Sequence, residues 1–68
     1  MRHVIVYKDP ESEAYIAEVP SLPGCHSDGA TAEEAVENVK DAIQLMESYM
    51  RDNGEAIPAD VDLEVVTV

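Results

Sequence analysis

The stretch PGCHSDGATAEE, residues 23–34, combines a turn, a short strand and the start of a helix, and the rest of the fold is arranged around it. Pro23 and Gly24 suit the two central positions of a type II turn, because proline presets a negative φ and glycine accepts a positive one. The segment Cys25–Asp28 is predicted to be a short third strand that ends at Gly29.

A capped helix follows this strand. Thr31 and Glu34 match a capping box, in which the threonine hydroxyl accepts from the amide of Glu34 and the glutamate reaches back to the amide of Thr31. The helix is predicted to run to about Asn53, with Gly54 as the residue that ends it. One apolar stripe recurs at three- and four-residue steps and should face the core; it comprises Ala32, Val36, Val39, Ile43, Met46 and Met50.

The flanking segments have the composition of strands. RHVIVYK (2–8) and AYIAEV (14–19) are rich in β-branched and aromatic residues and should pair as an antiparallel hairpin around the turn residues 9–13. VDLEVVTV (61–68) is predicted to be a last strand, with Val61, Leu63 and Val65 on one face. The predicted order is therefore β-β-β-α-β, which is an α+β fold in one domain spanning 1–68.

The predicted sheet has more apolar surface than one helix can cover. The first strand places Val4 and Val6 on one face and Ile5 and Tyr7 on the other. A single helix covers only one face of a sheet. We therefore expect the second face, including Ile5 and Tyr7, to be covered by another copy of the chain or by another protein.

The helix carries a second apolar edge beside its main stripe. Ala42, Leu45 and Tyr49 have i, i+3, i+7 spacing and form a candidate partner or oligomer interface. The alternative is a wide core stripe with Tyr49 over its rim and Leu45 singly exposed, which is normal for a surface leucine. Glu47 and Arg51 are spaced to form a favourable i,i+4 ion pair.

Composition limits the functions that the chain can have. Its 68 residues form one small domain, and its formal net charge of −11 opposes binding to DNA, RNA or anionic membranes. An acidic field favours a basic partner, although it also simply maintains solubility. No stretch is apolar enough to span a membrane, no signal peptide is visible, and one free cysteine suits the reducing cytoplasm.

No catalytic, metal or cofactor site is expected. Cys25 and His26 are adjacent, so they point to opposite faces of a strand and cannot readily share a zinc ion; Cys25 is expected to be buried and His26 exposed. Fifteen acidic residues make accidental carboxylate pairs inevitable. Asp28, Asp41 and Asp62 are the acidic residues on or near ordered elements, and they leave a vestigial metal-dependent nuclease as a remote alternative.

The residues around the turn and helix resemble a known family, the HicB-like antitoxins, including the short stand-alone members of the UPF0150-type group. The motif is Ala17-x-x-Pro20-x-Leu22-Pro23-Gly24-Cys25-x-Ser27-x-Gly29-x-Thr31, followed by Glu34-Ala35, Asn38 and Ala42-Ile43. The resemblance covers essentially the whole chain, and the proline-glycine-cysteine turn before a capped helix is its most specific part.

The resemblance implies a truncated ribonuclease H-like fold: a three-stranded antiparallel sheet, one helix on one face, and a last strand parallel to the first. It implies a non-catalytic protein, because the family has generally lost the ribonuclease H carboxylate site. It also implies self-association and a small basic HicA-type toxin that cleaves mRNA as the partner.

Two functions remain open on these grounds. The chain is expected to be an antitoxin that neutralises such a toxin by direct binding, and the alternative is an orphan homo-oligomeric domain with a scaffold or regulatory role. Many HicB antitoxins carry a C-terminal DNA-binding domain; this sequence stops after the last predicted strand at Val68, so we expect no such domain and no operator binding.

Overall fold

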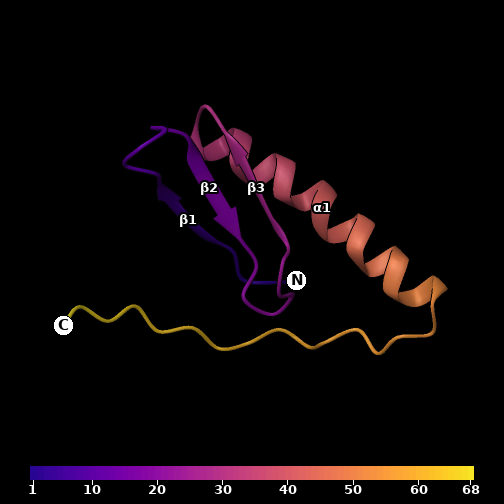
Figure 1. Cartoon of the computed structure of the whole chain (residues 1–68). Coiled ribbons are helices and arrows are strands. Elements are labelled where there is room, and N and C mark those ends of the chain that lie inside the picture. Colours follow the sequence, from indigo (N-terminus) through magenta and orange to yellow (C-terminus); the bar gives the residue numbers. More distant parts are fainter.

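The computed structural model describes all residues, 1–68, and is an α+β fold of one antiparallel sheet and one helix (Figure 1). Three strands, β1 (Ile5–Lys8), β2 (Tyr15–Glu18) and β3 (His26–Gly29), lie in the order β1-β2-β3. Helix α1 spans Ala32–Asp52. Both strand pairs are antiparallel, so the hairpin and the three-stranded sheet predicted from the sequence are confirmed.

The core lies between α1 and one face of the sheet. Its fully enclosed members come from β2, from the loop before β3 and from the helix, and they are Ala17, Val19, Leu22, Cys25, Ala35 and Val39. The helical part of the core is centred on Ala35 and Val39, with Ile43, Met46 and Met50 packed against it. The predicted stripe is therefore confirmed in its second half, but its N-terminal centre is Ala35, while Ala32 and Val36 are only half-buried.

The loop before β3 is built from consecutive tight turns. The amide of Cys25 donates to the carbonyl of Leu22 at 2.9 Å, and Gly24 between them has φ +84°, as a type II turn requires. The Val19 amide then donates to the Cys25 carbonyl at 3.0 Å. These bonds satisfy the loop backbone and allow the side chain of Leu22, 1% exposed, to enter the core.

Local hydrogen bonds define both ends of α1. The Thr31 hydroxyl accepts from the amide of Glu34 at 3.1 Å, as predicted, but the Glu34 carboxylate reaches the amide of Ala30 rather than that of Thr31. At the other end Gly54, with φ +70°, donates to the Arg51 carbonyl, and the next amide, of Glu55, donates to Met50 at 2.8 Å. This pair of bonds is a Schellman motif, which confirms Gly54 as the residue that ends the helix.

Gly29 sits where β3 meets the first turn of α1. A Cβ atom at this position would lie 2.6 Å from the amide nitrogen of Ala35 and 2.8 Å from the Cβ of Glu34. A side chain therefore cannot be accommodated unless the strand and the helix move apart. Close approach of the two backbones, rather than an unusual φ, is the reason for glycine here.

The predicted last strand does not form. Residues 55–68 are extended but make no ladder with β1, and in Figure 1 this segment passes the start of β1 and then diverges from it. The exposed fraction of its apolar side chains rises from 37% at Val61 to 100% at Val65. A strand needs a partner at the right distance, and alternating apolar residues cannot supply that partner by themselves.

Candidate protein-interaction surfaces

An open apolar groove runs along one edge of α1. It has a volume of about 460 Å³ and is lined by Gly24, Cys25, His26, Ala42, Leu45, Met46 and Tyr49. Leu45 is 74% exposed and Tyr49 is 62% exposed, whereas Ala42 is partly buried against the core. The structure thus brings the three predicted helix residues together beside the turn that precedes β3.

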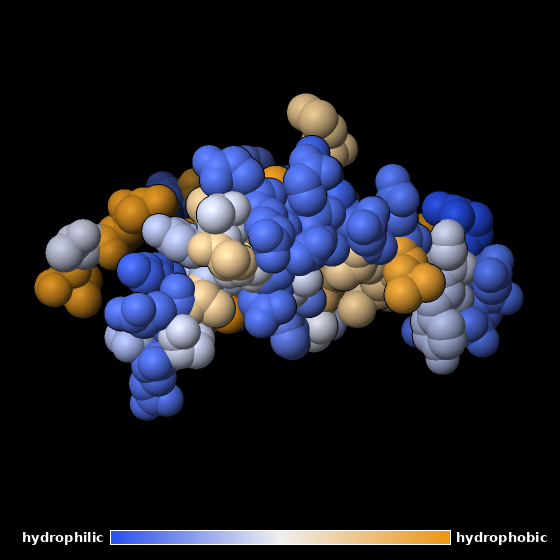
Figure 2. Space-filling view, turned by 90° about the horizontal axis from the view of Figure 1, so that it is seen from above, coloured by the Kyte–Doolittle hydropathy of each residue, from blue (hydrophilic) through white to orange (hydrophobic).

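Carboxylates flank this groove on the helix. Asp41 lies one turn before Leu45, and Asp52 lies one turn after Tyr49; both are exposed. Neither makes an ion pair within the chain. Viewed from above, the helix-bearing face is mostly hydrophilic, with small hydrophobic areas between the polar side chains (Figure 2). The groove therefore combines exposed apolar side chains with an unneutralised acidic rim.

Ile5 and Tyr7, the other predicted interface residues, lie on a separate surface. In the register of the sheet Ile5 is opposite Glu18, and Tyr7 is opposite Ile16, on the face away from α1. Ile5 is 41% exposed and Tyr7 is 44% exposed. The Tyr7 hydroxyl donates to the Glu18 carboxylate at 2.8 Å, and this bond raises the pKa of Tyr7. The two predicted sets of interface residues therefore do not form one continuous site.

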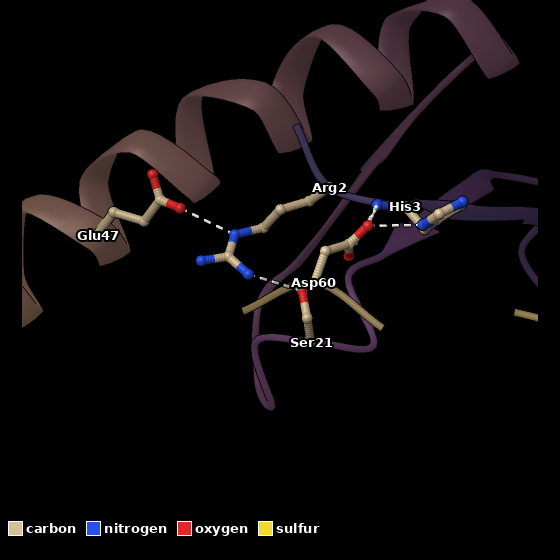
Figure 3. A network of polar contacts seen from close by, with 5 residues as sticks. All are labelled: Arg2, His3, Ser21, Glu47 and Asp60. Carbon is tan, nitrogen blue, oxygen red and sulfur yellow. Dashed lines mark hydrogen bonds and ion pairs between the residues drawn. The ribbon is translucent and has the colours of Figure 1, made fainter. Parts of the chain in front are cut away.

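A polar network joins the N-terminal segment to the helix and to the C-terminal segment (Figure 3). Arg2, whose side chain is 9% exposed, donates from Nε to Glu47 at 2.8 Å and from Nη1 to the Ser21 hydroxyl at 2.9 Å. The predicted pair of Glu47 with Arg51 is therefore wrong, because Glu47 is engaged by Arg2. Separation by 45 residues explains why no local sequence pattern indicated this contact.

The second half of this network is formed by His3 and Asp60. The Asp60 carboxylate accepts from the backbone amide of His3 at 3.0 and 3.1 Å, and its Oδ2 lies 2.6 Å from the ring Nδ1 (Figure 3). The His3 amide is the main reason that the pKa of Asp60 falls to about 2. Stabilisation of the ionised carboxylate fixes residue 60 of the C-terminal segment beside the N-terminus.

The groups considered for catalysis are dispersed. Asp28, Asp41 and Asp62 are exposed and lie on β3, on α1 and in the C-terminal segment respectively. No group of three or more His, Cys, Asp and Glu side chains is placed to hold a metal ion. Cys25 is 4% exposed, as predicted, and burial raises the pKa of its thiol, which disfavours the nucleophilic thiolate; His26 is exposed, also as predicted.

Fold and surfaces together define a small acidic α+β domain with an exposed apolar groove on α1 and a polar network at its N-terminus. Residues 3–68 match the family described as "HicB_like antitoxin of bacterial toxin-antitoxin system". The chain therefore belongs to the HicB-like antitoxin family. This finding confirms the resemblance carried by the turn and the capped helix.

Relatives of the same length support this assignment. A UPF0150 protein of Thermoplasma acidophilum is 35% identical over 68 residues, covering 100% of this chain and 97% of the relative. A UPF0150 protein of Archaeoglobus fulgidus is 39% identical over 69 residues, covering 98% and 99% of the two chains. No solved structure matches this sequence. The only helix, α1, is not apolar enough to cross a membrane.

Proposed function

We propose that this protein is an antitoxin that neutralises a small, basic, mRNA-cleaving toxin of the HicA type by covering its RNA-binding surface. The observation that carries the proposal is the pair of unneutralised carboxylates, Asp41 and Asp52, beside the apolar groove of α1, in a chain that belongs to an antitoxin family. The protein acts in this proposal as a binding partner and not as an enzyme.

Electrostatics supports a basic partner. Of the fifteen acidic residues, only Glu37, Glu47 and Asp60 lie within ion-pair distance of a basic group of the chain. Free carboxylates accelerate association with a protein of opposite charge and disfavour nucleic acid. A toxin that binds RNA must itself present a basic surface, since phosphates are neutralised by lysine and arginine. The antitoxin would compete with the RNA for that surface.

Leu45 and Tyr49 supply the apolar part of the proposed contact. Tyrosine is enriched at interfaces because its ring buries a large area and its hydroxyl tolerates water. Charged residues around an apolar centre set orientation and association rate, while the apolar centre contributes most of the affinity. Leu45 and Tyr49, with Asp41 and Asp52 beside them, have this arrangement. The site of action is the cytoplasm, where the mRNA is and where the thiol of Cys25 stays reduced.

Co-expression with a small basic toxin of the HicA type, sought first in the reading frames beside the gene, tests the proposal. The two proteins should purify as a complex of fixed ratio, and the toxin's cleavage of RNA should be suppressed in proportion to the antitoxin added. Raising the salt concentration should slow association, because exposed charges are screened. A toxin whose cleavage is unaffected by a molar excess of this chain would refute the proposal.

Matched variants locate the surface. Tyr49→Ala should weaken the complex by roughly 2 kcal/mol, the size of an interface hot spot. Gln44→Ala, an exposed change elsewhere on the same helix, should leave the affinity unchanged. Equal effects of both variants would place the contact elsewhere on the molecule. If the chain forms only homo-oligomers and captures no toxin, the alternative of an orphan scaffold or regulatory domain is supported instead.

A further inference from the structure

The C-terminal segment, residues 61–68, leaves the body of the molecule as an unpaired extended chain. After Asp60 it keeps partial cover at Leu63, which is 38% exposed, and then loses it, since Val66 is 70% exposed and Val68 is fully exposed. The free end stands out at the left of both Figure 1 and Figure 2. Its sequence, VDLEVVTV, is rich in β-branched residues, which suit a strand and gain nothing by extending into water.

The outer edge of β1 has no partner strand. Ile5–Lys8 pairs with β2 only, and no backbone group of these residues makes a hydrogen bond outside that ladder. The four residues contain no proline, and they carry a single charge, that of Lys8. An edge without a partner can accept another strand, because its outward N–H and C=O groups are already aligned.

The chain's own tail is held away from this edge. At the point where a ladder with β1 would begin, the amide of His3 donates to the side chain of Asp60 and not to a backbone carbonyl. A carboxylate between two backbones keeps them further apart than the spacing of about 4.8 Å that strand pairing needs. The segment then diverges from β1, so the geometry directs it outward.

The N-terminal segment, residues 1–8, and the C-terminal segment, residues 61–68, carry side-chain charges of opposite sign. Residues 1–8 carry Arg2 and Lys8, which are half of the basic residues of the chain, and no acidic residue. Residues 61–68 carry Asp62 and Glu64 and no basic residue. Lys8 makes no ion pair within the chain. Arg2 is already paired with Glu47, so Lys8 at the end of β1 is the unpaired positive charge that an acidic strand would meet.

We propose that residues 61–68 add as an edge strand to β1 of a second copy of the chain, and that the two copies exchange these segments reciprocally. Each sheet would then have four strands, the fourth contributed by the partner. The missing last strand would then be formed between chains. This interface uses neither Leu45 nor Tyr49 and does not depend on the toxin.

The oligomeric state of proline variants tests the exchange. The wild type should sediment as a dimer. Val65→Pro and Val66→Pro are made separately because successive amides of a strand face opposite edges, so only one of the two prolines removes a donor that faces β1. At least one variant should raise the dimer Kd by about 100-fold, because each dimer contains the change twice and a tenfold loss per copy corresponds to about 1.4 kcal/mol. The matched Val65→Thr and Val66→Thr variants should remain dimeric, and far-ultraviolet circular dichroism should show an intact α1 in all four.

Cross-linking distinguishes exchange from pairing within one chain. Unlabelled Ile5→Cys protein is mixed with ¹⁵N-labelled Val65→Cys protein and treated with a short bismaleimide, and wild type controls for the buried Cys25. Exchange predicts cross-links between labelled and unlabelled chains. The double variant Ile5→Cys/Val65→Cys is treated in the same way, to detect pairing within one chain. A monomeric wild type, proline variants that dimerise as the wild type does, or cross-links that form only within the double variant and not between the mixed single variants would each overturn the proposal.

Discussion

Gly29→Ala tests the close approach of β3 to α1 most directly. The added methyl group would lie 2.6 Å from the amide nitrogen of Ala35, 2.8 Å from the Cβ of Glu34 and 2.9 Å from its carbonyl carbon. Two of these three atoms belong to the helix backbone and cannot rotate away. Relief therefore requires the first turn of α1 to move off the strand, and that turn carries the Thr31 cap and the fully buried Ala35.

The loss of stability caused by Gly29→Ala can be compared with the total stability of the domain. Overpacking a well-packed core costs roughly 1–3 kcal/mol of stability. The cost of Gly29→Ala should be about 3 kcal/mol, because two of the atoms that the methyl group meets belong to the backbone and cannot move aside. The entropy gained from replacing glycine offsets less than about 1 kcal/mol. A chain of 68 residues has a total stability of about 3–10 kcal/mol. Gly29→Ala should therefore lower the Tm by roughly 10–20 °C, or leave the domain partly unfolded at room temperature.

Thermal and urea unfolding followed by circular dichroism provide the measurement, with Gly24→Ala as the control. Gly24 has φ +84°, and a methyl group added there would have no atom within 4 Å, so its substitution costs only backbone strain, about 1–2 kcal/mol. The expected order of stability is wild type, then Gly24→Ala, then Gly29→Ala. Equal stability of the two variants would refute the argument that the absence of a side chain at Gly29 is what allows the strand and the helix to approach.

Three further predictions concern the cap, the core and the C-terminal contact. Thr31→Ala removes the acceptor of the Glu34 amide and should cost about 1 kcal/mol in urea unfolding, while Thr31→Ser should restore most of that loss. Val39→Asp places an unpaired charge at a fully buried site and should unfold the domain, at a cost of about 3–5 kcal/mol. Leu45→Asp, at a site that is 74% exposed, should change the stability by less than about 0.5 kcal/mol. Unfolding by both variants would show that the assigned helix faces are wrong. The pKa of Asp60 is lowered to about 2, so its contact with His3 is fully present above about pH 4 and is lost as the pH falls through 2; the amide signal of His3 in an NMR titration should report this loss, and Asp60→Asn should remove the pH dependence.

Local chemistry in the sequence determined the turn, the helix and the hairpin. The type II turn at Gly24, the cap at Thr31 and the helix end at Gly54 each depend on residues a few positions apart, so their hydrogen bonds could be predicted without knowing the rest of the chain. The apolar stripe likewise oriented α1 correctly, because helical periodicity fixes which side chains share a face. The motif around the turn also identified the family, which the match over residues 3–68 confirmed.

Only the tertiary structure decided the contacts between distant segments. It paired Glu47 with Arg2 and not with Arg51, placed Ala35 at the centre of the helical core, and showed that Gly29 is required by the approach of two backbones. It also left residues 61–68 without the ladder that their alternating pattern predicts. A helix forms its backbone hydrogen bonds within one segment, whereas a strand needs a second strand as its partner. The sequence of the strand alone does not determine which segment that partner is.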